Sequence, residues 1–355
     1  TTDIKYLQKE YDITEHILDH YANYDYLKPL LYSIKDISKF VRQIMLKKIA
    51  PKQLFQLYKN LKTILEIREK TALEYILETY LKTSPTCSNI EHINKYCELI
   101  LNYLETNFVL EECEQLDSIS SFETMFLKPG VNEELDNKIK LLDESREKME
   151  AIRQYLNECI SKMEKSKTTM DSIKIHETEK NNFSLIATKR RCQILKQYLS
   201  TIGSNTVLLE YNINGQPRQF QFAVSNILFE NQTTSNDSIN SQQIKELCKN
   251  ISTIKITMKE LITTVYLTLI KELNNFSNEF DLINKYICSI DIVYAKATIA
   301  KKYNYCKPTI SSVSSFSLSS VVKVKSLRHC LIEHIQQNEL YVSNDIILGK
   351  EEERE

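Results

Sequence analysis

The residues in this sequence whose types and spacing best suit binding chemistry are three adjacent cations, Lys189, Arg190 and Arg191. They follow an apolar run, Phe183 to Ala187. A compact Lys/Arg group can contact the phosphates of a DNA backbone without reading its sequence. The alternative is a solvated turn whose three basic residues face water. Residues 171–241 hold seven Lys or Arg against six Asp or Glu, so the segment as a whole attracts phosphate only weakly.

Catalytic chemistry has no comparable signal. The six histidines are spread along the chain without pairing, and no Ser-His-Asp, HExxH or DxD arrangement stands out. A phosphate-cradling loop needs glycines, but the chain has four in all and neither GxxxxGK[ST] nor GxGxxG. The nine cysteines lack metal-site spacing, which predicts reduced, mostly buried thiols in an intracellular protein. We therefore expect no catalysis from this chain itself.

Two long helices must position the basic cluster. An apolar repeat of strict seven-residue spacing predicts the first helix, without a Pro or Gly to interrupt it: Leu135, Leu142, Met149, Leu156, Met163 and Met170. At about 1.5 Å per residue this helix is on the order of 50 Å long, so it needs a partner of similar length. Residues 242–276 keep nearly the same repeat and predict that partner. The methionines are expected to fill the core.

The segment between the two helices has a different composition. Runs rich in β-branched and aromatic residues predict strands within 183–188, 205–213 and 219–229. Asn214-Gly215 lies between the last two and predicts a hairpin, because both turn positions need positive φ. The Asn, Thr and Ser residues of 231–241 predict a mobile loop. We expect a small β-rich module at the far end of the helix pair.

The rest of the chain is predicted to be mainly helical, since 355 residues contain only four glycines and six prolines. Apolar stripes predict helices within 1–50, from Pro51 to beyond Ile64, and at 70–81, 90–104 and 280–303. The sequence therefore predicts a mainly α fold with a small β-rich module, in which a helical core continues into long antiparallel helices that carry the insertion.

The totals limit the classes of function. A formal net charge of −1 gives no global case for a nucleic-acid binder, although a local basic patch remains compatible with it. No apolar run is long enough to span a membrane. The missing initiator Met and the acidic end at Glu351 to Glu355 suggest a piece of a longer chain.

Four motifs resemble the MutS family of mismatch-repair proteins. Residues 327–333, LRHCLIE, are similar to the family's RHP-x-(I/V)-E block at the start of its ATPase domain, and 341–345, YVSND, to the aromatic and Asn that follow it. Ile34 to Ile37 and Ala50 to Leu54 resemble the family's core-helix pattern. Residues 129–136, PGVNEELD, are similar to the sequence that opens its lever helix. The motifs also occur in the family's order, from about residue 20 to 349.

The sequence departs from the family pattern at two motif positions. Cys330 stands where the family has Pro, and Ser38 stands where it has an acidic residue. The mismatch-reading N-terminal domain and the ATPase proper are not expected in this chain. The Asn-, Ile- and Lys-rich composition suits a divergent branch, as in large DNA viruses or organelles.

The resemblance implies roles for individual residues. Tyr341 would stack on the adenine of ATP, and Asn344 and the backbone of Val342 would bind its edge; the alternative is a strand edge that packs a Tyr. Lys189, Arg190 and Arg191 would approach the duplex backbone. ATP with Mg would bind only in the longer protein, which would be an ATPase and a homo- or heterodimer through its ATPase domain.

We therefore expect the DNA-binding lever and clamp portion of an ATP-dependent protein that recognises mismatched double-stranded DNA. The expected parts are a helical core, an outgoing lever helix, a β-rich clamp, returning lever helices and the start of the ATPase domain, at 1–134, 135–170, 171–241, 242–308 and 309–355. The alternative is a coiled-coil tether with a β-rich interaction tip and no DNA role. No membrane is expected as a partner.

Overall fold

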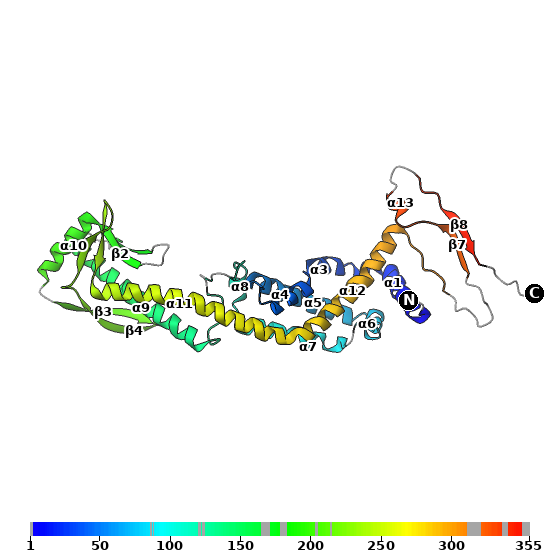
Figure 1. The fold of residues 1–355 in the computed structure, drawn as a ribbon, viewed down its shortest axis with the longest axis horizontal. Helices are drawn as coiled ribbons and strands as arrows, with labels where there is room; N and C mark the ends of the chain where they lie inside the picture. Colours follow the sequence, from blue (N-terminus) through cyan, green and yellow to red (C-terminus); the bar gives the residue numbers. More distant parts are fainter. Residues whose placement is uncertain are drawn as a thin grey trace, which may run out of the picture.

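The molecule is elongated, with a helical body in the middle, a β-rich end on one side and a hairpin on the other (Figure 1). A computed structural model describes residues 3–85, 87, 89–119, 122, 125–164, 171–177, 183–202, 205–213, 215–310, 321–335 and 340–349. The predicted class, mainly α with a small β module, is confirmed.

The helical body is built from the first third of the chain. Its elements are α1 (Ile4–Asp19), α2 (Tyr21–Tyr24), α3 (Leu27–Ser33), α4 (Ile37–Met45), α5 (Pro51–Ala72), α6 (Tyr75–Lys82), the 3-10 turn η1 (Ile90–His92), α7 (Ile93–Asn107) and α8 (Leu110–Cys113). Helix α5 begins at Pro51, as predicted, because proline fits the first turn of a helix. The backbone N–H of Ala50 donates to Gln53 Oε1 over 2.9 Å and closes that helix start.

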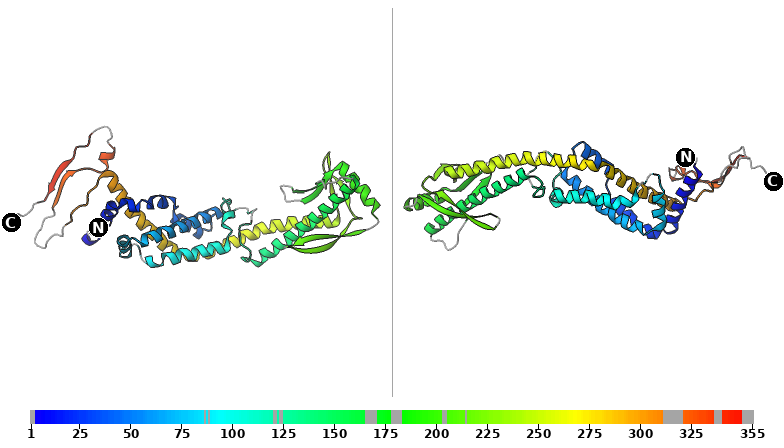
Figure 2. Two further views of the ribbon diagram at one scale, coloured as in Figure 1. Left: turned by 180° about the vertical axis from the view of Figure 1, so that it is seen from behind. Right: turned by 90° about the horizontal axis from the view of Figure 1, so that it is seen from below.

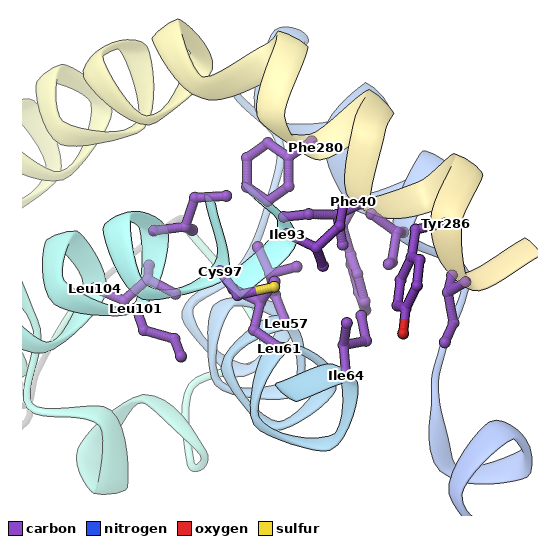
Figure 3. Packing of buried hydrophobic residues seen from close by; sticks show 14 of the residues in the cluster. Phe40, Leu57, Leu61, Ile64, Ile93, Cys97, Leu101, Leu104, Phe280 and Tyr286 are labelled. Atoms are coloured by element: carbon purple, nitrogen blue, oxygen red, sulfur yellow. The ribbon is translucent and has the colours of Figure 1, made fainter. Parts of the chain in front are cut away.

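The core of the body forms where α5 and α7 meet a later helix, α12 (Ser277–Tyr303). Leu57, Leu61 and Ile64 repeat along one face of α5 and are fully buried. Figure 3 shows them against Ile93 and Cys97 of α7, with Phe280 and Tyr286 of α12 on the other side. Segments from the first and last thirds of the chain thus share one hydrophobic core.

The long helix pair consists of α9 (Glu133–Glu164) and α11 (Gln242–Leu273), which lie side by side in opposite directions. A 3-10 turn, η2 (Asn274–Phe276), joins α11 to α12, so the returning α-helix ends slightly before the predicted Phe276. The predicted seam is buried at Leu135, Leu142, Met149 and Leu156. Met163 is 42% exposed, so its prediction as a core filler is wrong. Met170 lies outside the described residues.

The β-rich end carries a four-stranded antiparallel sheet in the order β1-β2-β6-β5, a separate hairpin and one helix. Its elements are β1 (Ile173–Glu177), β2 (Phe183–Thr188), α10 (Lys189–Thr201), β3 (Thr206–Ile213), β4 (Gln216–Ala223), β5 (Leu228–Asn231) and β6 (Asn236–Asn240). Gly215 has φ +78 in the β3–β4 turn, as a tight hairpin requires. Asn214 lies outside the described residues.

Two predictions for this end are wrong. Residues 231–241 are not simply a loop, because β6 lies inside them and pairs with both β2 and β5. The polar composition hid a strand whose Ser238 and Ile239 are buried by its neighbours. Helix α10 was not expected at all, although Cys192, Leu195 and Leu199 have helical spacing.

After α12 the chain forms the C-terminal hairpin, which consists of β7 (Val322–Leu327), a short α13 (Ile332–Ile335) and β8 (Asn344–Leu348).

All nine cysteines are free, and five of them are buried. No helix in the described part of the chain is long and apolar enough to cross a membrane.

Candidate nucleic-acid interface

The basic cluster occupies the first turn of α10. Strand β2 ends at Thr188, which has extended backbone angles and caps the helix without a side-chain hydrogen bond. The N–H of Lys189 donates to the carbonyl of Ser235 over 3.1 Å, which fixes the helix start beside β6. Lys189, Arg190 and Arg191 are therefore the first three residues of a helix and not part of a turn.

Packing decides which face of α10 meets solvent. Cys192 and Leu195 are buried in the core of the β-rich end, together with Leu156 and Cys159 of α9. The opposite face exposes Arg190, Gln193, Lys196 and Gln197, and Lys189 and Arg191 are half-buried. The sequence of α10 contains four basic residues and no acidic residue. Its outer face is consequently polar, and all the charged side chains on it are positive.

Some other cations at this end form ion pairs. Arg153 of α9 pairs with Glu150 and with Asp171, the latter over 2.6 Å, and Lys245 pairs with Glu230 over 3.0 Å. The hydrogen bonds from Arg153 hold the pKa of Glu150 below its ordinary value. By contrast, no ion pair among the described residues involves any of the four cations of α10: Lys189, Arg190, Arg191 and Lys196.

The start of α10 is also suited to an anion. A helix N-terminus leaves backbone N–H groups without intrahelical partners and carries partial positive charge. Acidic side chains usually occupy such a turn, but α10 has none there. Its three cations add to the positive charge, at some cost to the helix. A phosphate placed beside this turn would reduce the repulsion and accept hydrogen bonds.

The end of α9 fixes the base of this module. Asn157 is buried, and its Oδ1 accepts hydrogen bonds from the N–H groups of Ser172 and Ile173 over 3.0 and 2.9 Å. On the other side, Ser241 Oγ accepts from the N–H of Ile244 and caps α11. The module is therefore joined to both long helices by hydrogen bonds as well as by its core.

The sequence did not single out Lys196 or Asn157. Lys196 lies seven residues after Lys189, which is about two helical turns. It could be assigned to the same side as Lys189 only if residues 189–201 were predicted to be a helix. Asn157 looked like one polar residue among many on the outer faces of a heptad helix. Only the chain reversal after α9 gives it two backbone donors.

The predicted adenine-binding residues lie at the opposite end of the molecule, in the C-terminal hairpin (Figure 2). Tyr341 is half-buried, and its Oη accepts a hydrogen bond from the N–H of His329 over 2.8 Å. Val342 is 72% exposed, and Asn344 is exposed at the start of β8. An aromatic ring with polar groups nearby is the chemistry that a purine needs, and in this structure these groups lie on an open surface. In the part of the chain that the structure describes, no group of three His, Cys, Asp or Glu side chains is arranged to hold a metal ion.

Comparison with known proteins supports the motif analysis. A mismatch-repair mutS homologue of Acanthamoeba polyphaga mimivirus is 21% identical over 351 residues, which cover 97% of this chain and 29% of that protein. The mismatch-repair protein MutS of Petrotoga mobilis is 21% identical over 99% of this chain, and that of Thermodesulfovibrio yellowstonii is 23% identical over 99%. The resemblance to MutS is confirmed.

Two facts define the extent of this similarity. The chain spans about a third of the length of these MutS relatives, between 29% and 36% of each. No family model matches it. One of the MutS relatives is viral and the others are bacterial, so the likeness extends across distant sources.

Proposed function

We propose that this chain is the lever and clamp portion of a MutS-type mismatch-repair protein, and that the outer face of α10 holds the backbone of duplex DNA. One observation carries the proposal: four cations on one short helix have neither an acidic neighbour in that helix nor an ion-pair partner among the described residues. The names of the relatives, DNA mismatch-repair proteins, agree with a DNA partner.

Phosphate contacts of this kind hold DNA without reading its sequence. Lys and Arg side chains displace the counterions of the backbone, and the released ions make the affinity depend steeply on salt. Residues that read a mismatch would need contacts to base edges, which a short cationic helix face does not supply by itself. The function of α10 is accordingly to grip the duplex.

The long helix pair would act as a pair of arms. A helix of 32 residues is about 48 Å long, and neither α9 nor α11 contains a Pro or Gly that would bend it. Displacement at one end of such a pair moves the other end. We keep the proposed division into core, outgoing lever, clamp, returning lever and start of an ATPase domain, at 1–134, 135–170, 171–241, 242–308 and 309–355.

ATP belongs to the same proposal. Tyr341 would stack on adenine, while Asn344 and the backbone of Val342 would bind its edge. The exposed position of all but the half-buried Tyr341 agrees with a site whose other walls come from elsewhere. Bound Mg-ATP would supply the energy for a cycle of clamp opening, in a homo- or heterodimer.

DNA binding is tested by following affinity against salt. The 355-residue chain is titrated with matched and mismatched duplexes by fluorescence anisotropy at several salt concentrations. Replacing Lys189, Arg190 and Arg191 with Ala removes up to three phosphate contacts, so the slope of log K against log salt should become shallower by about 2 to 3. Both duplexes should lose affinity by the same factor, because phosphate contacts do not distinguish bases.

The control removes the same charge elsewhere. Lys28, Lys39 and Lys95 are exposed lysines of the helical body that make no ion pair with a described residue. Their triple Ala variant should keep the slope of the wild-type chain. Equal slopes for both triple variants would contradict the role of α10. A wild-type chain that bound no DNA at any salt would favour the coiled-coil tether.

A further inference from the structure

Arg328 joins α12 to the C-terminal hairpin through its hydrogen bonds. Its Nη2 donates to the carbonyls of Tyr303 and Asn304 over 3.0 and 2.9 Å, and its Nη1 donates to Glu333 Oε1 over 3.1 Å. Tyr303 is the last residue of α12, and Asn304 follows it in the left-handed conformation with φ 51. The guanidinium therefore caps the C-terminus of the helix that returns from the β-rich end.

This arrangement is favourable for physical reasons. The last carbonyls of a helix have no intrahelical donors and carry partial negative charge, so a cation that donates to two of them stabilises the end. Glu333 holds the guanidinium from the other side. A planar fork can bridge these three acceptors at once, which an ammonium on a flexible stem does less well.

The next residue reaches the proposed adenine site. The N–H of His329 donates to Tyr341 Oη, and its Nδ1 accepts from the N–H groups of Leu331 and Ile332 over 3.3 Å each. Arg328 and His329 are consecutive, so one peptide unit separates the cap of α12 from the anchor of the Tyr341 ring. A displacement of the Tyr341 ring would therefore be transmitted to the end of α12 through few intervening bonds.

A β-bulge fixes the direction of Arg328. The register of β7 against β8 shifts between Val324 and Leu327, and Ser326 has φ 51. The N–H of Ser326 donates to Asp345 Oδ1 over 2.7 Å. A bulge bends its strand and changes the direction of the side chains that follow it, here toward α12. The opposite strand thus holds the joint in place.

We infer that Arg328 is a positioning residue that couples the Tyr341 site to α12, and through η2 and α11 to the β-rich end (Figure 2). This inference rests on the proposed binding of ATP at Tyr341 and of DNA at α10. An occupant that moves the Tyr341 ring alters the His329 contact, and Arg328 transmits the change to the helix end. Loss of Arg328 should leave both sites intact but independent.

The test measures the coupling between ATP binding and DNA binding in the full-length protein. DNA affinity is measured with and without a saturating non-hydrolysable ATP analogue and Mg²⁺, and ATP-analogue affinity is measured separately. In the wild type the nucleotide should change the DNA Kd by about tenfold, within the usual range of coupling between sites. In Arg328→Ala the change should fall below about twofold, while each affinity measured alone stays within about twofold of wild type.

Two further variants separate coupling from folding and from charge. Arg328→Lys keeps the charge but cannot bridge both carbonyls and Glu333 equally well, so its coupling should be reduced. Lys271→Ala removes an exposed cation from the last turn of a different helix, α11, and its coupling should be that of wild type.

The outcomes distinguish this inference from the function on which it rests. A wild-type protein that failed to bind either ligand would overturn the proposed function and this inference together. A wild type that bound and coupled both ligands, with Arg328→Ala coupling them equally well, would overturn the role of Arg328 alone.

Discussion

Arg68 in the helical body and the cations of α10 at the β-rich end lie in opposite environments. In the body, Arg68 of α5 forms a two-armed pair with Glu78 of α6 over 2.7 and 2.9 Å, and the two side chains are only 10% and 13% exposed. At the β-rich end, the cations of α10 lie at the surface, and no described acidic side chain pairs with them.

The difference follows from the energy of solvation. A buried ion loses its water and is tolerated only with a partner of good geometry. The fold therefore requires that Arg68 pair with an acidic side chain. An exposed cation keeps its water, and folding leaves it free for a ligand. The charge of α10 is therefore not required by the packing of the fold and is available to a ligand.

The largest effect should come from breaking the buried pair. Arg68→Met leaves Glu78 without its main partner in the core of the body, and we expect a loss of about 3–5 kcal/mol in the free energy of unfolding. Urea unfolding followed by circular dichroism measures it. Lys285→Met, which breaks an exposed pair with Asp281, should cost under about 1 kcal/mol. A similar loss in both variants would show that burial of the Arg68 pair is unimportant.

The second effect concerns the seam of the long helix pair. Leu156→Ala should destabilise by about 2–5 kcal/mol, because Leu156 is fully buried between α9 and the β-rich end. Met163 is at the next heptad position, but its side chain is already 42% exposed. Met163→Ala should therefore lower the free energy of unfolding by under about 1 kcal/mol. The same unfolding measurement compares them. Equal losses would mean that the seam continues to Met163.

This pair of residues shows what periodicity can and cannot predict. The seven-residue repeat from Leu135 predicts the long helix and its buried side correctly, because one helix face meets one partner over many turns. At Met163 the helix is one residue from its end at Glu164, and the repeat no longer has a partner to bury it. A repeat identifies the face of a helix but not where its partner stops.

The β-rich end was harder to predict than the helices. Strand β6 has the polar sequence Asn-Asp-Ser-Ile-Asn, and it forms because two neighbouring strands supply its hydrogen bonds. Helix α10 follows β2 directly, and its basic start was interpreted as part of a β-rich tip or as a solvated turn. The predicted Lys189, Arg190 and Arg191 are adjacent in any structure, but the exposure of Arg190 and the addition of Lys196 depend on the missed helix.

The joint at Arg328 shows the same limit for distant contacts. The sequence singled out the block from Leu327 to Glu333 and the residues around Tyr341 as motifs. Nothing in the sequence indicates that the block from Leu327 to Glu333 contacts both the end of α12 and Tyr341. Such a contact joins three segments, and only the fold brings them together.

The smallest predicted effect distinguishes stability from function at α10. A helix N-terminus favours negative charge, so Arg190→Glu should stabilise the chain by about 0.3–1 kcal/mol at low salt, while its affinity for DNA falls. Urea unfolding measures the first change and fluorescence anisotropy with duplex DNA the second. Arg190→Gln removes the positive charge without adding a negative one, so both of its changes should be intermediate. Because Arg190 is exposed, added salt should screen the gain in stability.

If Arg190→Glu weakened both folding and binding, the cation would serve the fold, and its contrast with Arg68 would disappear. Opposite signs would mean that this surface keeps an arrangement unfavourable to its own helix because a phosphate completes it.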